Sequence, residues 1–242
     1  MKTEFRCPVC KNALRREDRT YKCTMNHSFD IAKQGYVNLL RSQKSSKKRH
    51  GDDTLMVKSR QDFLEKGFYA PLRDEIVKTV TALAGEELTL LDLGCGECWY
   101  TAEIYRILCE SGVDAQVFGI DISKQALIYG AKRCKDLHLA VASTSEVPLD
   151  DGSCDICLCV FAPYNEAEIL RVLRKDGVFI KVFPLEEHLM GLKKAIYDKP
   201  YKNEVSREIG EGFEETSFVS VRNNIVLTSG EDIMNLFRMT PY

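Results

Sequence analysis

Residues 90–101 (LLDLGCGECWYT) constrain the fold more than any other stretch of the chain. A short apolar run contains the acidic Asp92, glycines follow at positions 94 and 96, and the pattern of an amphipathic helix comes next. This order predicts a strand, a tight turn and a helix, with backbone N–H groups gathered at the helix N-terminus. Because Gly94 and Gly96 lack Cβ atoms, we expect a ligand to lie directly against the main chain there.

Two classes of cofactor bind at such a turn. A nicotinamide-binding fingerprint needs a third glycine at position 99, where this chain has Trp99. Residues 115–122 (AQVFGIDI) predict the next strand, whose Asp121 is placed to accept hydrogen bonds from both hydroxyls of a ribose. The turn and Asp92 together resemble motif I of the class I S-adenosylmethionine-dependent methyltransferases. A purely structural turn in an unrelated doubly wound domain is the alternative.

The first 40 residues carry a separate pattern of metal ligands. Cys7 and Cys10 form one pair, and Cys23 and His27 form a second pair after twelve intervening residues. Three thiolates and an imidazole predict a closed, tetrahedral site for structural zinc. The metal would compensate for a core too small to fold alone. Free thiols in a loop are the alternative, and a redox pair is disfavoured because no βαβ pattern surrounds Cys7 and Cys10.

The rest of the chain predicts an α/β fold, Rossmann-like and mostly parallel, with the zinc-ribbon-like module at residues 1–40 attached to it. Residues 41–53 (RSQKSSKKRHGDD) are basic and lack apolar side chains, which suits a flexible linker or a phosphate-binding arm. The methyltransferase domain is expected at residues 54–242, beginning with two helices separated at Gly67. Its expected strands after the first two lie at residues 137–143, 155–162, 178–183 and 218–227, and a final helix at 231–239.

Composition and charge exclude several classes of protein. The formal net charge is −2, so a surface for nucleic acid must be local rather than global. No apolar run approaches the ~18 residues that cross a bilayer, and the N-terminus lacks the apolar core of a signal peptide. We therefore expect a cytoplasmic protein without a membrane partner, whose ten cysteines are reduced or bound to metal. Cys154 and Cys157 are expected on opposite faces of one strand, buried as small apolar side chains.

Further motifs indicate a narrower family. They are residues 29–40 (FDIAKQGYVNLL), 51–53 (GDD), Arg60, 67–74 (GFYAPLRD) and 188–190 (HLM). With the zinc pattern and motif I, they closely resemble the bacterial 23S rRNA (guanine-N1)-methyltransferases of the RlmA family over nearly the whole chain. The resemblance implies a homodimeric enzyme that methylates N1 of one guanine in a 23S rRNA hairpin, with the zinc module helping to hold the RNA.

The resemblance also implies roles for single residues. Cys7, Cys10, Cys23 and His27 correspond to the zinc ligands. The residues expected to contact S-adenosylmethionine are Tyr69, Asp92, Gly94, Gly96, Glu97, Asp121 and His188. No residue is singled out to accept the N1 proton, and Glu97 and Asp155 are both candidates. Because N1 lies on the Watson–Crick edge, the base must leave its stack, and Phe161 and Tyr164 are candidates to stack on it.

The chain departs from the family pattern at three points. Cys98 replaces the usual glycine and is expected to place its side chain near the amino-acid end of the cofactor. Phe161 replaces a frequent tyrosine. A last helix and antiparallel strand are expected beyond residues 239–242 (MTPY), and their absence would leave an unpaired edge in the sheet. Two other functions stay open: a small-molecule methyltransferase with a structural zinc module, and a non-catalytic relative that binds RNA or cofactor.

Overall fold

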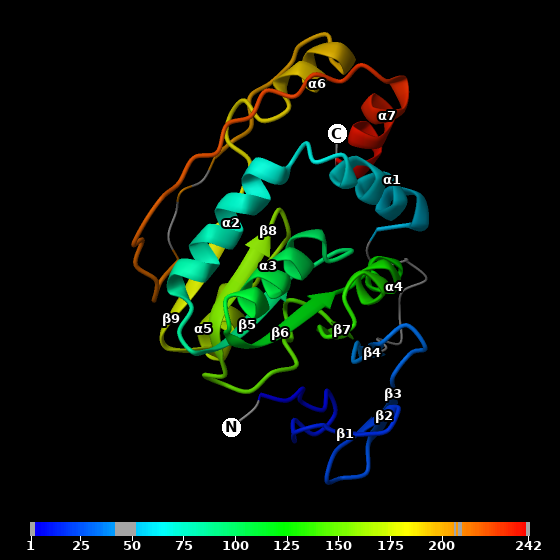
Figure 1. Ribbon diagram of the computed structural model, residues 1–242, viewed down its shortest axis with the longest axis vertical. Coiled ribbons are helices and arrows are strands. Elements are labelled where there is room, and N and C mark those ends of the chain that lie inside the picture. Colours follow the sequence, from blue (N-terminus) through cyan, green and yellow to red (C-terminus); the bar gives the residue numbers. More distant parts are fainter. Residues whose placement is uncertain (1–2, 42–51, 206, 208–209, 241–242) are drawn as a thin grey trace.

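The computed structural model describes residues 3–41, 52–205, 207 and 210–240. Most of the basic segment expected at residues 41–53 lies outside the described residues. The described chain forms two sheets (Figure 1). The smaller is antiparallel and contains β1 (Arg15–Glu17), β2 (Thr20–Lys22) and β3 (Ser28–Asp30).

The larger sheet is parallel throughout, which confirms the expected Rossmann-like fold. Its strands are β4 (Tyr36–Asn38), β5 (Glu87–Leu93), β6 (Asp114–Asp121), β7 (His138–Val141), β8 (Cys154–Val160) and β9 (Leu173–Val182). They lie in the order β4-β7-β6-β5-β8-β9. The direction of winding changes between β5 and β8, and ligands bind at the carboxyl edge beside such a switch point. Residues 94–98 and Asp121 lie at this edge.

Helices cover both faces of the parallel sheet. They are α1 (Thr54–Glu65), α2 (Ala70–Leu83), α3 (Trp99–Glu110), α4 (Lys124–Arg133), α5 (Glu166–Val172), α6 (Met190–Ile196) and α7 (Gly230–Met239). Along β5, Leu88 and Leu90 pack in the core beneath α2, α3 and α4, whereas Leu91 and Leu93 pack on the side of α5 and the N-terminal residues. This is the alternation expected of a strand buried on both faces. None of the described helices is long and apolar enough to cross a membrane.

The N-terminal module shares its core with the parallel sheet. Phe5 is buried and packs edge-to-face on Phe118 of β6, with ring centroids 5.2 Å apart. Of the apolar residues in the module, Leu14 is buried in the same cluster, and Tyr21 packs against it. The strand β4, which also belongs to the first 40 residues, forms an edge of the larger sheet. The zinc pattern therefore belongs to a unit that is continuous with the methyltransferase fold.

The strand expected at residues 218–227 is not formed. This prediction was wrong because an alternating apolar pattern makes a strand only where a neighbour supplies backbone hydrogen bonds. Among the described strands, β9 ends the sheet, and none pairs with this segment. Ile225 and Leu227 instead pack near Phe63 of α1, while Val226 is 78% exposed.

The cysteines of β8 are buried, as predicted, but their expected placement on opposite faces was wrong. A register shift between Cys154 and Ile156 interrupts the alternation of the strand. Cys154 and Cys157 consequently share one core cluster, and the hydrogen bond of the Cys157 thiol with Cys154, together with burial, raises the pKa of that thiol. Both behave as small buried apolar side chains.

Candidate functional site

Backbone hydrogen bonds hold the turn after β5 against the end of β6. The amides of Gly94 and Cys95 donate to the carbonyl of Ile120 at 2.9 and 3.1 Å. The Asp121 carboxylate accepts a bond from the Gly96 amide at 2.9 Å and another from the Ser123 amide at 2.7 Å. Each oxygen keeps a further lone pair, so Asp121 can still accept hydrogen bonds from a ligand.

The two glycines of the turn have different neighbours. Both have positive φ angles, +76° at Gly94 and +56° at Gly96, which favour glycine. A Cβ at Gly94 would lie 2.4 Å from the Cβ of Ala162 in the loop after β8, so the chain itself makes the close approach there. A Cβ at Gly96 would lie 3.6 Å from Nη1 of Arg60. The expectation of open space for a ligand beside both glycines therefore needs correction on the Ala162 side of Gly94.

Three carboxyl groups surround the turn: Asp92 and Glu97 are buried, and Asp121 is partly buried. Asp92 accepts a bond from the Thr101 hydroxyl at 2.5 Å, and burial raises the pKa of Asp92 to about 7. Burial also raises the pKa of Glu97 and of Asp121. Asp92 Oδ1 and Glu97 Oε2 are buried without a hydrogen-bond partner among the described residues. Acceptors left in this way favour a ligand that brings cationic or N–H donors.

Tyr69 and His188, far apart in the sequence, meet at the same edge of the sheet. The Tyr69 hydroxyl lies 3.0 Å from His188 Nε2, and the His188 ring stacks on Phe161 with centroids 5.7 Å apart. His188 Nδ1 is buried without a hydrogen-bond partner in the described part of the chain. Burial, with the nearby charge of Lys193, lowers the pKa of His188, so its imidazole is neutral at pH 7.

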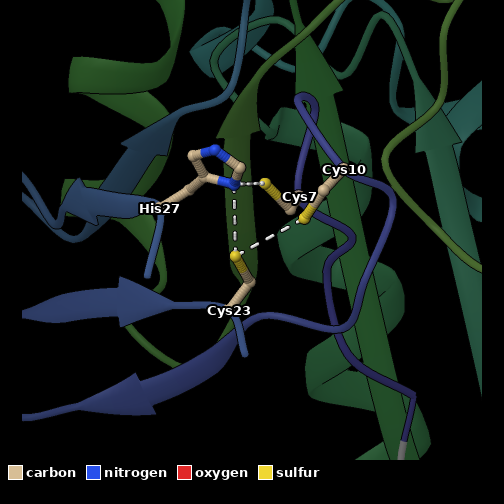
Figure 2. Close-up of side chains that lie close together, drawn as sticks. All are labelled: Cys7, Cys10, Cys23 and His27. Carbon is tan, nitrogen blue, oxygen red and sulfur yellow. Dashed lines mark hydrogen bonds between the residues drawn. The ribbon is translucent and has the colours of Figure 1, made fainter. Parts of the chain in front are cut away.

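The four metal-ligand candidates of the N-terminal module converge (Figure 2). Their ligand atoms all lie within 4.8 Å of one another. His27 Nδ1 is 3.5 Å from Cys7 Sγ and 3.4 Å from Cys23 Sγ, and Cys10 Sγ is 3.5 Å from Cys23 Sγ. Ligand atoms around a tetrahedral zinc ion lie roughly 3.5–3.8 Å apart, given Zn–S bonds of about 2.3 Å. The donor set and its spacing therefore fit zinc.

Comparisons with known proteins place both parts of the chain. A family model described as "RlmA, N-terminal" matches residues 5–48, and one described as "Methyltransferase domain" matches residues 91–181. The chain is 40% identical over 195 residues to the 23S rRNA (guanine(748)-N(1))-methyltransferase of Streptomyces fradiae, covering 79% of this chain and 67% of that protein. It is 34% identical over 248 residues to the Bacillus subtilis (strain 168) protein named "Putative 23S rRNA (guanine-N(1)-)-methyltransferase YxjB", covering 98% of this chain and 86% of that protein. This chain belongs to the 23S rRNA (guanine-N1)-methyltransferase family.

Cys98, which replaces the usual glycine of this methyltransferase family, directs its side chain away from the turn and toward α4. Cys98 was expected to place its thiol near the amino-acid end of a cofactor, and the structure shows this thiol packed against α4. The side chain is fully buried, and its Sγ lies 2.6 Å from where a Cβ at Gly130 of α4 would stand. The thiol thus fills the contact with α4, although the φ of +60° at Cys98 costs roughly 1–2 kcal/mol relative to glycine.

The three residues considered as contacts of the target base, Phe161, Tyr164 and Asp155, lie in different surroundings. Phe161 is 43% exposed with a φ of +54°, whereas Tyr164 packs inward against Phe179, with centroids 5.2 Å apart. Asp155 lies near the amino end of β8, where it accepts a bond from the Thr89 amide at 2.6 Å and pairs with Arg174. Asp155 is therefore on the wrong edge of the sheet to accept a proton from a base in this methyltransferase.

Sequence reasoning gave Arg60 of α1 no individual role. The structure places its guanidinium over the turn, 3.8 Å from Glu97 Oε2. No spacing rule could have revealed this, because α1 reaches the turn only through tertiary packing.

We expect the substitution Gly130→Ala to destabilise the fold. The added methyl group would crowd Cys98 Sγ and lie 3.3 Å from Cys98 Cβ. Overpacking costs about 1–3 kcal/mol, more than the helix propensity of alanine returns. Urea unfolding of Gly130→Ala, Cys98→Gly and the double variant measures the effect, and the double variant should be more stable than the sum of the single changes predicts. Gly191→Ala in α6, where nothing lies within 4 Å, is the control. Equal costs of Gly130→Ala in both backgrounds would contradict this packing.

We expect Asp92→Asn to stabilise the protein without ligand increasingly as pH rises. Folding raises the pKa of Asp92 to about 7, so the folded state binds more protons than the unfolded state between pH 4 and 7. Stability from this group is therefore present at low pH and lost as pH rises through 7. The variant should match the wild type near pH 4 and exceed it by about 4 kcal/mol at pH 8. Denaturant unfolding across this range tests it, with the exposed Asp74→Asn as control, and a pH-independent difference would refute it.

Proposed function

We propose that this protein transfers a methyl group from S-adenosylmethionine to N1 of a guanine in a hairpin of 23S rRNA. One observation carries this proposal: in a single chain, a Cys₃His cluster adjoins a methyltransferase sheet whose motif I turn is surrounded by Asp92, Glu97 and Asp121, the first two of them buried. The identity of 34–40% to relatives named for this reaction supports the same conclusion.

The proposed cofactor contacts are Tyr69, Asp92, Gly94, Gly96, Glu97, Asp121 and His188. Among the described residues, four buried side-chain atoms lack a hydrogen-bond partner, and three of them belong to this set: Asp92 Oδ1, Glu97 Oε2 and His188 Nδ1. The two carboxyl oxygens suit a ligand that carries an ammonium and a sulfonium charge, whereas His188 Nδ1 donates or accepts according to its tautomer. Asp121 suits ribose hydroxyls. Bound there, the cofactor would supply the activated methyl group.

Phe161 is the proposed platform for the target base. Guanine N1 takes part in base pairing, so the base must be turned out of its stack before it can react. The exposed Phe161 ring follows the carboxyl end of β8, beside Tyr69 and His188. Its positive φ is a strained conformation of the kind found at functional sites. Stacking on this ring would align N1 for transfer and exclude water.

The proposed role of residues 1–40 is to bind structural zinc and hold the RNA. Cys7, Cys10, Cys23 and His27 would fill all four positions around the metal, leaving none for chemistry. The hairpin of β1 and β2 exposes basic side chains in a protein of net charge −2, which suits RNA phosphates. They are Arg15, Arg16, Arg19 and Lys22.

We also propose a homodimer in the cytoplasm, as the family resemblance implies. Exposed apolar side chains on α7 support a protein partner: Ile233 is 43% and Met234 44% exposed.

The decisive experiment is primer extension on 23S rRNA transcripts incubated with protein and S-adenosylmethionine. We expect reverse transcriptase to stall at one guanine, because an N1-methyl group blocks pairing. Asp121→Ala should lower the rate about 100-fold, since it removes charge-assisted hydrogen bonds to the turn and to a ribose. Absence of both a stall and methyl incorporation would refute the proposal. Methyl transfer to metabolites alone would favour the small-molecule enzyme, and calorimetry without cofactor binding would favour the non-catalytic relative.

We expect one zinc ion per chain, and its loss to lower the stability of the whole fold. His27→Ala removes one ligand and should cost several kcal/mol, as metal-binding energy is folding energy in such modules. Because Phe5 of the module packs on Phe118 of β6, unfolding should remain one transition at a lower temperature. Metal analysis and calorimetry measure both effects. The exposed Cys109→Ser is the control, and unchanged metal content in His27→Ala would contradict the assigned ligands.

A further inference from the structure

Arg60 is a mostly buried cation at the motif I turn. Its side chain is 23% exposed. Nη1 lies 3.8 Å from Glu97 Oε2, and 3.6 Å from where a Cβ at Gly96 would stand. The guanidinium therefore lies beside Gly96, whereas the nearest neighbour of a Cβ at Gly94 would be the Cβ of Ala162, at 2.4 Å.

The position of Arg60 is fixed by the neighbouring helix starts. Its Nη2 pairs with Asp52 Oδ2 at 2.5 Å. The backbone carbonyl of Asp52 accepts a bond from the hydroxyl of Ser123, the cap of α4, at 2.9 Å. Asp53, the next residue, caps α1 by accepting from the Met56 amide at 2.8 Å. Asp52 thus orients one side of the guanidinium, and Nη1 makes no hydrogen bond with the described residues.

Arg60 and Glu97 carry opposite charges and lie close together, but they form no hydrogen bond with each other. A separation of 3.8 Å is an ion pair but too long for a hydrogen bond. Glu97 Oε2 is buried with no hydrogen-bond partner in the described part of the chain. Buried charges that lack hydrogen bonds destabilise a protein. This arrangement therefore favours a ligand that donates hydrogen bonds to Glu97 and accepts them from Arg60. A ligand with an ammonium and a carboxylate on one carbon has the matching charges.

We propose that Arg60 binds the carboxylate of the methionine part of S-adenosylmethionine while Glu97 binds its ammonium group. This inference rests on the proposed function, because it assumes that the turn holds this cofactor. Arginine suits the role because its planar fork matches the two oxygens of a carboxylate. Asp52 is a positioning residue that presents the fork. The alternative is a purely structural ion pair that closes α1 over the turn.

Calorimetry with three ligands separates these roles. S-adenosylmethionine carries both charges of the amino acid, its decarboxylated form lacks only the carboxylate, and methylthioadenosine lacks the whole amino-acid part. The wild type should bind S-adenosylmethionine about 10–100-fold more tightly than the decarboxylated form, the range of one charge-assisted contact. Arg60→Met should abolish this preference and leave binding of the other two ligands within about threefold. Arg60→Lys should restore part of it.

Two matched variants complete the experiment. Glu97→Gln should weaken binding of both ligands that carry the ammonium, and leave methylthioadenosine unaffected. Arg106→Met, in an exposed part of α3, should change none of the three affinities. Binding of methylthioadenosine also reports that each variant is folded.

The outcomes that overturn the inference are distinct from failure of the proposed function. Equal weakening of all three ligands by Arg60→Met would assign Arg60 a structural role and overturn the inference alone. So would a wild type that does not discriminate against the decarboxylated ligand. A folded wild type that binds none of the three ligands would overturn both the inference and the proposed function.

Discussion

The bond between the Asp121 carboxylate and the Gly96 amide is the contact on which the rest of the site depends. It joins the turn after β5 to the end of β6, and the Ser123 amide donates to the same carboxylate at the start of α4. The turn is thereby fixed at the switch point of the sheet, where a bound ligand meets backbone N–H groups and helix N-termini. These two hydrogen bonds hold the turn, the end of β6 and the start of α4 together.

Several groups near the Asp121–Gly96 hydrogen bond lower the stability of the protein without ligand. Asp92 and Glu97 are buried, and each has one oxygen that no described residue hydrogen-bonds. The non-glycine residues Cys98 and Phe161 adopt left-handed backbone conformations. Such features cost stability, and they persist at functional sites because the surrounding core over-determines them. Here that core is the sheet, with strands buried on both faces.

The N-terminal module is joined to the same support. The Arg6 amide donates to the Pro148 carbonyl at 2.8 Å, Lys11 pairs with Glu146, and Phe5 packs on Phe118. The first two contacts connect the zinc-binding module to the segment that follows β7, and the third connects it to β6. If the module binds RNA as proposed, these contacts would keep that RNA at a constant distance from the turn, which a freely tethered module would not do.

The sequence by itself determined the local features of this protein: the strand, turn and helix around Gly96, the cap at Ser123, the helices on either side of Gly67, and the four residues of the zinc pattern. Each depends on backbone conformation or on short spacing, which neighbouring residues fix. Only the tertiary structure decided the meeting of Tyr69 with His188, the direction of the Cys98 thiol, the approach of Arg60 to Glu97, and the lack of a strand at residues 218–227. These depend on which surfaces are close in space, and side-chain direction and strand pairing follow from neighbours that are remote in the chain.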